Sequence, residues 1–149
     1  MMSLLSNMKK KILIADDEFT IRELLEMSLD EDYEVDKAND GEEAIKKAKN
    51  KPDLIILDVM MPKIDGYEVC NRLKSSKETR DIPIIMLTVK HTAEDLKKAI
   101  SCNVDEFMTK PFEPEILKKR VDSYLNKEKQ KAKLSQFDRT IHYIKGHDS

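Results

Sequence analysis

The chain has 149 residues, of which 40% are hydrophobic, so it is long enough to form one domain with one buried core. Its 27 Lys and Arg residues nearly balance 29 Asp and Glu residues, which argues against a protein that binds nucleic acid through bulk positive charge. No stretch approaches the roughly 18 apolar residues of a membrane span, and the N-terminus lacks the apolar core of a signal peptide.

Five short runs of strand character follow one another along the chain, at residues 12–15, 33–37, 54–57, 84–87 and 104–108. Three of them, with the sequences ILIA, LIIL and IIML, are apolar throughout. Continuous apolar runs of this length are typical of strands that helices cover on both faces. We therefore predict five strands, of which at least three are central.

Amphipathic segments with helical spacing separate these runs, and their apolar positions fall at residues 21–29, 44–48, 69–73, 96–100 and 117–125. Asp40, Asp65 and Thr92 each stand three residues before an acidic residue, as N-terminal capping residues do. Pro114 is suited to the first turn of the last helix, and Asn103 to a left-handed residue after the fourth.

Five alternating strands and helices with short connections predict an α/β fold: a doubly wound, five-stranded parallel sheet with helices on both faces and right-handed crossovers. We divide the chain into an N-terminal extension (1–9), this domain (10–126) and a C-terminal extension (127–149). The last 24 residues hold six Lys or Arg and three Asp or Glu, and the stripe Leu134, Phe137, Ile141 and Ile144 is amphipathic. Because no Gly or Pro lies between 127 and 133, we expect the last helix to continue into this basic extension.

Polar residues directly follow the strands, at the edge where ligands bind in an open parallel sheet. They are Asp16, Asp17 and Glu18 after the first strand, Asp58 after the third, Thr88 after the fourth and Lys110 after the fifth. Clustered carboxylates repel one another unless a cation lies between them, and an all-oxygen site with few protein ligands suits Mg²⁺. Such a site can support phosphoryl transfer to a carboxylate, with the ammonium and hydroxyl groups binding the phosphoryl oxygens.

Each residue alone has a simpler explanation. Asp16 and Asp17 could begin a helix, where carboxylates favour the positive end of the dipole. Asp58 could be a turn residue, Thr88 a half-buried strand end and Lys110 a solvated surface lysine. The four strand ends together carry the interpretation, because chance would have to place a suitable residue at every one of them.

The chain resembles the receiver domain of two-component response regulators over about residues 10–126. The matching motifs are ILIADDE at 12–18, LIILDVMMPKIDG at 54–66, IIMLT at 84–88 and DEFMTKPF at 105–112. The resemblance implies a flavodoxin-like fold with strand order 2-1-3-4-5. It also implies a cytoplasmic signalling switch, without an enzymatic activity beyond its own phosphotransfer and dephosphorylation.

By this resemblance, Asp58 is the phosphoacceptor, and a sensor histidine kinase, a phosphotransfer protein or a small acyl phosphate is the donor. Asp17, Asp58 and the backbone carbonyl of Met60 would bind Mg²⁺ directly, and Asp16 would act mainly through water. Thr88 and Lys110 would bind the phosphoryl group.

The resemblance also implies how the signal leaves the site. Thr88 would draw the following loop inward, and Phe107 would turn into the vacated space; Phe stands where the family often has Tyr. Val89 is bulkier than the small residue that receivers commonly have there, so it could narrow access to the acyl phosphate. The Lys110–Pro111 peptide bond would be cis.

The expected output surface comprises the fourth helix, the fifth strand and the fifth helix. Arg120 lies where many receivers pair across a dimer with an acid such as Asp105 or Glu106, so a weak activated homodimer or a protein partner is expected there. We expect no membrane contact and no direct nucleic-acid binding by this chain.

Alternatives from other classes fit less well. A flavodoxin-like cofactor binder needs Gly and hydroxyl residues at the first strand–helix turn, where this chain has Asp16, Asp17 and Glu18. A phosphate-transferring hydrolase generally has a second acid two residues after its Asp nucleophile, where this chain has Met60. A docking module that needs no phosphorylation stays open.

Cys70 and Cys102 match no metal-binding spacing, and with only three well-separated His residues a zinc site is not expected. We expect both cysteines to be reduced and partly buried.

Overall fold

The predicted strands form one five-stranded parallel sheet in the order β2-β1-β3-β4-β5. The computed structural model describes residues 8–89 and 92–126; residues 1–7, 90–91 and 127–149 lie outside the described part. Its elements, in chain order, are β1 (Lys11–Ala15), α2 (Phe19–Leu29), β2 (Glu34–Ala38), α3 (Gly41–Ala48), β3 (Leu54–Asp58), α4 (Gly66–Lys74), β4 (Ile84–Thr88), α5 (Ala93–Ser101), β5 (Glu106–Thr109) and α6 (Pro114–Leu125). The predicted doubly wound fold is confirmed.

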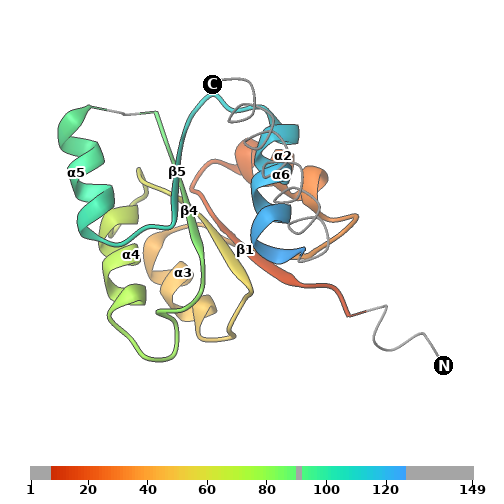
Figure 1. Cartoon of the computed structure of the whole chain (residues 1–149), viewed down its shortest axis with the longest axis horizontal. Helices are drawn as coiled ribbons and strands as arrows, with labels where there is room; N and C mark the ends of the chain where they lie inside the picture. Colours follow the sequence, from red (N-terminus) through yellow and green to blue (C-terminus); the bar gives the residue numbers. More distant parts are fainter. Residues whose placement is uncertain (1–7, 90–91, 127–149) are drawn as a thin grey trace, which may run out of the picture.

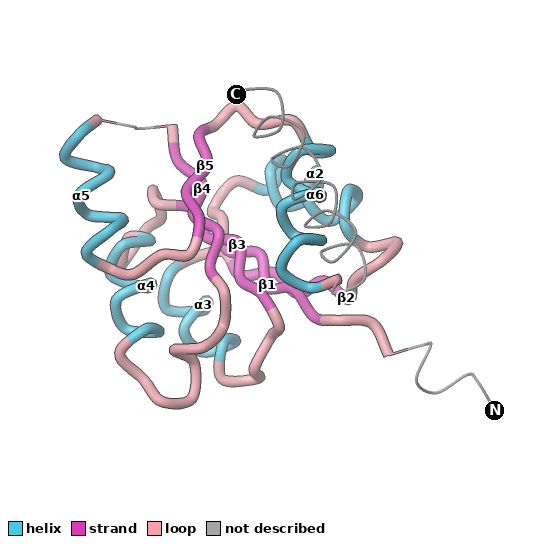
Figure 2. Tube along the Cα trace, in the orientation of Figure 1, coloured by secondary structure: helices cyan, strands magenta, loops and turns pink. Residues whose placement is uncertain are grey.

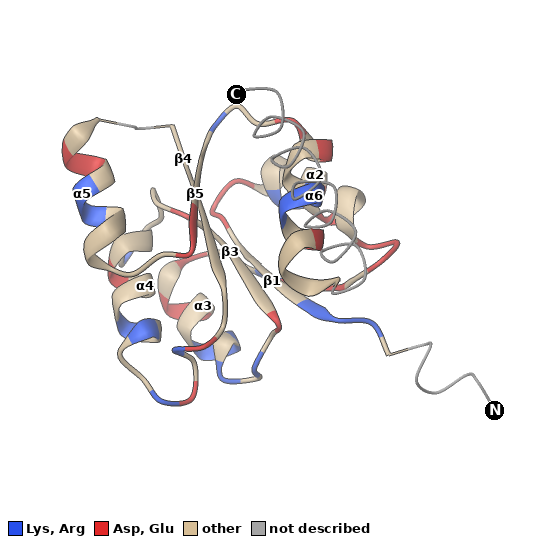
Figure 3. Ribbon diagram, viewed as in Figure 1, with Lys and Arg blue, Asp and Glu red and all other residues tan. Residues whose placement is uncertain are grey.

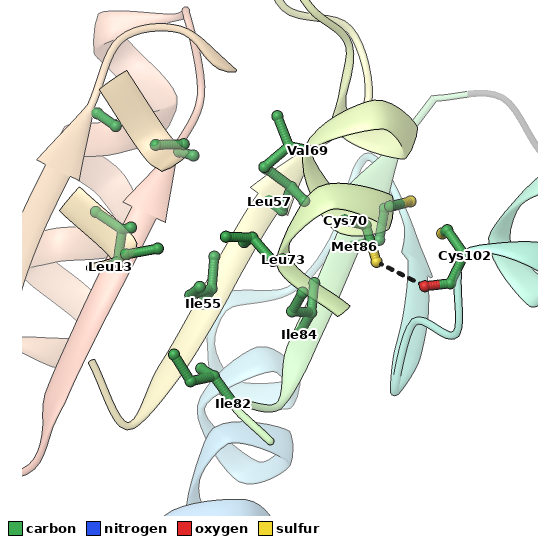
Figure 4. Packing of buried hydrophobic residues seen from close by; sticks show 14 of the residues in the cluster. Leu13, Ile55, Leu57, Val69, Cys70, Leu73, Ile82, Ile84, Met86 and Cys102 are labelled. Atoms are coloured by element: carbon green, nitrogen blue, oxygen red, sulfur yellow. Dashed lines mark hydrogen bonds between the residues drawn. The ribbon is translucent and has the colours of Figure 1, made fainter. Parts of the chain in front are cut away.

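Helices cover both faces of the sheet, with α3, α4 and α5 on one side and α2 and α6 on the other (Figures 1 and 2). Because successive side chains of a strand point to opposite faces, each central strand contributes to two cores. Leu57 and Met86, for example, belong to the core under α3 and α4 (Figure 4), whereas Ile56 and Leu87 belong to the core under α2 and α6. This double burial explains the continuous apolar runs of the sequence.

Two strands begin later than predicted, and backbone hydrogen bonds give the reason. The Tyr33 N–H donates to the Leu29 carbonyl and closes α2, so β2 begins one residue later than expected, at Glu34. The Val104 N–H donates to the Ala99 carbonyl at the end of α5 in the same way, and β5 begins at Glu106. In both cases the preceding helix uses the N–H group of the residue at which the strand was predicted to begin.

The predicted capping residues lie where the sequence placed them. Asp40 and Asp65 each accept a hydrogen bond from the backbone N–H three residues later, and Thr92 forms a capping box with Asp95. Pro114 occupies the first turn of α6, and Asn103 has the left-handed φ of 60°.

The end of α6 differs from the prediction. The helix stops at Leu125, and Asn126 is extended, with φ −109° and ψ 94°. Asn competes for backbone hydrogen bonds and favours helix ends, so the expected uninterrupted continuation of the last helix is wrong at this residue. The predicted C-terminal extension itself lies outside the described residues.

Acidic and basic side chains are interspersed over the described surface, and each of helices α3 to α6 carries both signs (Figure 3). No helix in residues 8–89 and 92–126 is both long enough and apolar enough to cross a membrane.

The helices are held by unequal numbers of buried side chains. In α4, Gly66, Val69, Cys70 and Leu73 are buried. Along α5, all of whose residues are described, Ala99 alone is buried. The contact of α5 with the core is therefore small.

Candidate functional site at the carboxyl edge of the sheet

The strand register brings the predicted site residues to one edge. Ala15 pairs with Leu57, so the residues that follow them, Asp16 and Asp58, emerge side by side from β1 and β3. Asp58 in turn pairs with Leu87, which precedes Thr88 in β4. Thr88 pairs with Thr109, which precedes Lys110. Four separate parts of the sequence thus meet at the ends of four adjacent strands, as predicted.

A lysine lies between two carboxylates at this edge. The Lys110 Nζ is 2.9 Å from Asp16 Oδ2 and 3.2 Å from Asp58 Oδ1. Asp16, Asp58 and Thr88 are buried, and the Lys110 side chain is 10% exposed. Charges in such a partly desolvated position interact more strongly than they would at an open surface.

The surroundings change the protonation of both partners. Burial, and then the charge of Asp16, raise the pKa of Asp58 to about 6 against the opposing effects of Lys110 and of the Met60 backbone N–H. Burial alone would lower the pKa of Lys110, but its hydrogen bonds to the two carboxylates and their charges raise it overall. Asp58 is therefore mostly ionised at neutral pH, and Lys110 is a cation.

The first strand–helix turn supplies further acidic oxygens. Carboxylate oxygens of Asp16, Asp17 and Glu18 lie within 4.8 Å of one another. The Glu18 N–H donates to Asp16 Oδ1 at 2.9 Å and fixes that side chain, and the Arg22 guanidinium donates to the Asp16 carbonyl at 2.7 Å. Asp58 is not part of this group, and its Oδ1 lies 3.2 Å from Lys110 Nζ. The all-oxygen donor set fits a hard cation such as Mg²⁺.

Gly66 is a positioning residue that the sequence analysis quoted in a motif without giving it a role. A Cβ atom at this position would lie 2.8 Å from the Val59 Cα, and it would also collide with the Asp58 carbonyl oxygen. The Gly66 N–H donates to the Val59 carbonyl at 2.8 Å. Only Gly lets the start of α4 approach the end of β3 this closely, and this approach holds the backbone that carries Asp58.

The fourth and fifth strands are joined behind the site. The Lys110 N–H donates to the Thr88 carbonyl at 2.7 Å, which couples the backbone of the lysine to that of the threonine. The Lys110–Pro111 bond is cis, as predicted. Phe107 is half-buried and packs against the core under α3 and α4. Val89 is 59% exposed, beside Thr88.

The charged residues predicted for the output surface have partners inside the chain. Arg120 Nη1 is 3.5 Å from Glu106 Oε1, which joins α6 to β5. Asp105 Oδ2 lies 2.8 Å from Lys74 Nζ and accepts the Ile84 N–H at 2.8 Å. Asp105 therefore stabilises the start of β4, a role that its position in the sequence did not reveal.

Comparison with known proteins matches residues 12–122 to the response regulator receiver domain. The chain belongs to the response regulator receiver family. It is 46% identical over 131 residues to the alkaline phosphatase synthesis transcriptional regulatory protein PhoP of Bacillus subtilis, an alignment that covers 87% of this chain and 54% of that protein. It is 43% identical to the transcriptional regulatory protein ResD of the same organism, with 80% of this chain and 50% of ResD covered.

Solved receiver structures share the fold. The chemotaxis protein CheY4 of Vibrio cholerae has a TM-score of 0.74 and 34% identity, covering 78% of this chain and 99% of CheY4. The BeF3-activated DrrB receiver domain has a TM-score of 0.73 and 31% identity, covering 79% of this chain and 98% of that domain. The chain spans about half the length of the curated relatives above. The comparisons favour a two-component receiver over the cofactor-binding and hydrolase alternatives.

Proposed function

We propose that Asp58 accepts a phosphoryl group from a sensor histidine kinase or a phosphotransfer protein, with Mg²⁺ as the cofactor. The observation that carries the proposal is the buried Asp58 carboxylate at the end of β3, 3.2 Å from Lys110 Nζ and beside Asp16. We propose that this exchange takes place in the cytoplasm, where the two cysteines would be kept reduced.

The residues of the chain have distinct parts in the transfer. An ionised Asp58 oxygen attacks the donor phosphorus, so that an O–P bond forms while the phosphorus–nitrogen bond to the donor His breaks. Lys110 balances the charge of the phosphoryl oxygens, and the Thr88 hydroxyl donates to one of them. When bound, Mg²⁺ supplies charge neutralisation; Asp17, Asp58 and the Met60 carbonyl would hold it, and Asp16 would contribute through water.

The response is proposed to pass from Thr88 to the surface formed by α5, β5 and α6, called here the α5–β5–α6 face. Thr88 is followed by the connection to α5, and Phe107 of β5 is only half-buried, so both can respond to a new group on Asp58. In this proposal the catalytic work of the chain is limited to its own phosphorylation and dephosphorylation.

Labelling tests the phosphoacceptor. Incubation with acetyl phosphate and MgCl₂ should add one phosphoryl group. The addition is followed over time at neutral pH by mass spectrometry of the intact protein. Asp58→Asn and excess EDTA should each abolish the addition. Asp81→Asn, at an exposed acid before β4 on the opposite edge of the sheet, is the matched control and should label normally. Labelling of Asp58→Asn, or labelling of the wild-type protein without divalent metal, would contradict the proposal.

A homodimer through the α5–β5–α6 face is the output that we propose. Leu96 and Ile100 are 49% and 68% exposed and lie four residues apart, hence on the same side of α5. Exposed apolar residues in a pair of this kind favour a protein contact. Arg120 lies on α6 with Glu106, and Glu106 is the acid better placed than Asp105 to exchange its partner across a dimer.

Sedimentation with and without beryllofluoride tests the dimer. The wild-type protein should associate only with the phosphate mimic, and Ile100→Lys should stay monomeric. Met27→Lys, at a 75% exposed residue of α2, is the matched control and should associate like the wild type. A wild-type monomer at every concentration would instead favour a heterologous partner.

The extension 127–149 lies outside the described residues, so its role is a proposal from sequence alone. Its apolar stripe and basic flank suit a protein contact, and the near balance of charge over the whole chain gives no reason to propose nucleic-acid binding. Deleting residues 130–149 should leave labelling of Asp58 and the melting temperature nearly unchanged and alter association. Unfolding on deletion would show that the segment belongs to the core.

A further inference from the structure

Two buried cysteines lie close together between α4 and the end of α5, away from the phosphorylation site. Cys70 is in α4, and Cys102 is the C-terminal cap of α5 (Figure 4). The Cys70 thiol donates to the Cys102 carbonyl at 3.2 Å, and the Cys102 thiol donates to the Ala99 carbonyl at 3.3 Å. The sequence showed only two cysteines that fit no metal motif; the fold makes them a pair.

The two thiols are not equivalent. Cys102 is 5% exposed and lines a pocket of about 480 Å³ between α4 and α5, together with Tyr67, Asn71 and Ser101. Cys70 is 0% exposed and does not line this pocket. A small oxidant in the pocket therefore reaches Cys102 before Cys70.

Reactivity follows the same order. The neighbouring Cys70 side chain, and then the backbone N–H groups of Val104 and Cys102, lower the pKa of Cys102 against the effect of its burial. The neighbouring Cys102, together with burial, raises the pKa of Cys70. Thiolates are the nucleophiles in cysteine oxidation, and sensor cysteines combine a low pKa and access with a neighbouring resolving thiol.

We propose that Cys102 and Cys70 are the attacking and resolving thiols of a peroxide-responsive disulfide that ties α4 to α5. The Cys102 thiolate attacks one oxygen of hydrogen peroxide; the O–O bond breaks, and with one proton the products are Cys102 sulfenic acid and water. The Cys70 thiol then attacks the sulfenic sulfur; the S–S bond forms, and the hydroxyl leaves as a second water with the Cys70 proton. Two thiols lose two electrons, which reduce one peroxide to two waters.

The disulfide would act on the helix that is least anchored in the core. Ala99 is the buried residue of α5, and Cys102 is next to its C-terminal end. A covalent bond to α4 at this end restrains α5, which carries Leu96 and Ile100. This effect on output rests on the proposed function, whereas formation of the disulfide does not.

Thiol counting and peptide mapping on the full chain test the proposal. After treatment with hydrogen peroxide, alkylation under denaturing conditions should find no free thiol in the wild type, and digestion should yield a peptide linked through Cys70 and Cys102. In Cys70→Ala, dimedone should capture a sulfenic acid at Cys102. In Cys102→Ala, Cys70 should stay reduced under the same treatment. Peptide mapping separates these products from methionine sulfoxide.

Two further measurements distinguish a failure of the disulfide proposal from a folding defect in a variant and from a failure of the proposed function. In the untreated wild type, iodoacetamide at neutral pH should modify Cys102 at least about tenfold faster than Cys70. Asp58→Asn should form the disulfide like the wild type, so a chain that fails to accept phosphate can still pass this test. Equal alkylation rates, or two thiols that react only after unfolding, would overturn the proposal.

Discussion

The two edges of the sheet both bury polar side chains, but they balance them differently. At the carboxyl edge, two buried carboxylates, Asp16 and Asp58, share the single ammonium of Lys110. At the amino edge, the Tyr33 hydroxyl before β2 donates to the Asp122 carboxylate near the end of α6. Burial, and then this hydrogen bond and the charge of Asp122, raise the pKa of Tyr33.

The difference separates a structural pair from a functional site. The amino edge joins one anion to a neutral donor that stays protonated, so the pair needs no further partner to be stable. The carboxyl edge has an excess of negative charge, to which Asp17 and Glu18 add. Buried charge without compensation is costly, and an incoming cation relieves it.

Removing the Lys110 ammonium, the only one that the described residues place between these carboxylates, should have the largest effect on stability. Lys110→Met leaves Asp16 and Asp58 buried without it, and loss of one partner of a buried ion pair costs about 3–5 kcal/mol. Urea unfolding in EDTA should show this loss, and MgCl₂ should restore more stability to the variant than it adds to the wild type. A loss below about 1 kcal/mol in EDTA would show that Asp16 and Asp58 do not repel each other strongly at this edge.

A substitution at the amino edge should cost less stability, and its effect should not depend on added metal. Asp122→Ala removes a hydrogen bond to a charged group and leaves the Tyr33 hydroxyl buried, so we expect a loss of about 2–3 kcal/mol. The double variant with Tyr33→Phe should lose less than the sum of the two single variants, since the Tyr33 hydroxyl is no longer left without its acceptor. Phosphorylation of Asp58 should be unchanged, and a magnesium-dependent difference would break the contrast between the edges.

Asp58→Asn should stabilise the metal-free protein, by on the order of 1–2 kcal/mol at neutral pH, because it removes a buried charge beside Asp16. The sign follows from the raised pKa: the folded state binds the Asp58 proton more readily than the unfolded chain, from an ordinary value of 3.8 to about 6. The free energy of unfolding of the wild type therefore falls as the pH rises from about 4 to 6. The gain from Asp58→Asn should vanish near pH 4 and be complete above pH 6, as pH-dependent urea unfolding in EDTA would measure.

The smallest effect is expected on the α5–β5–α6 face. Arg120 is 50% exposed, and its ion pair with Glu106 is long at 3.5 Å, so Arg120→Ala should change monomer stability by less than about 1 kcal/mol. If the proposed dimer forms, the same variant should weaken association in beryllofluoride. A large loss of monomer stability would instead make this ion pair structural, like the Tyr33–Asp122 pair.

Much of the site could be predicted because the continuous apolar runs mark the strand ends, and parallel strands bring those ends to one edge. The partnership of Lys110 with both Asp16 and Asp58 follows from this placement. The backbone contact at Gly66 could not be predicted, because its reason is a neighbour on another segment. The late starts of β2 and β5 were missed for a similar reason: Tyr33 and Val104 have strand-like neighbours, but their N–H groups bond to preceding helices. Pairing of Cys70 with Cys102 likewise depends on how α4 and α5 pack.

The small buried area of α5 sets how often this helix can separate from the domain. A helix held by Ala99, with Leu96 and Ile100 facing solvent, has little apolar surface to expose when it opens. Its amide hydrogens should therefore exchange with deuterated solvent through local openings, while those of β3 and β4 should exchange only when the whole domain unfolds. We therefore expect slow amide exchange in the sheet that holds Asp58 in place and fast exchange in α5. Hydrogen exchange measured by mass spectrometry should resolve these two groups of rates.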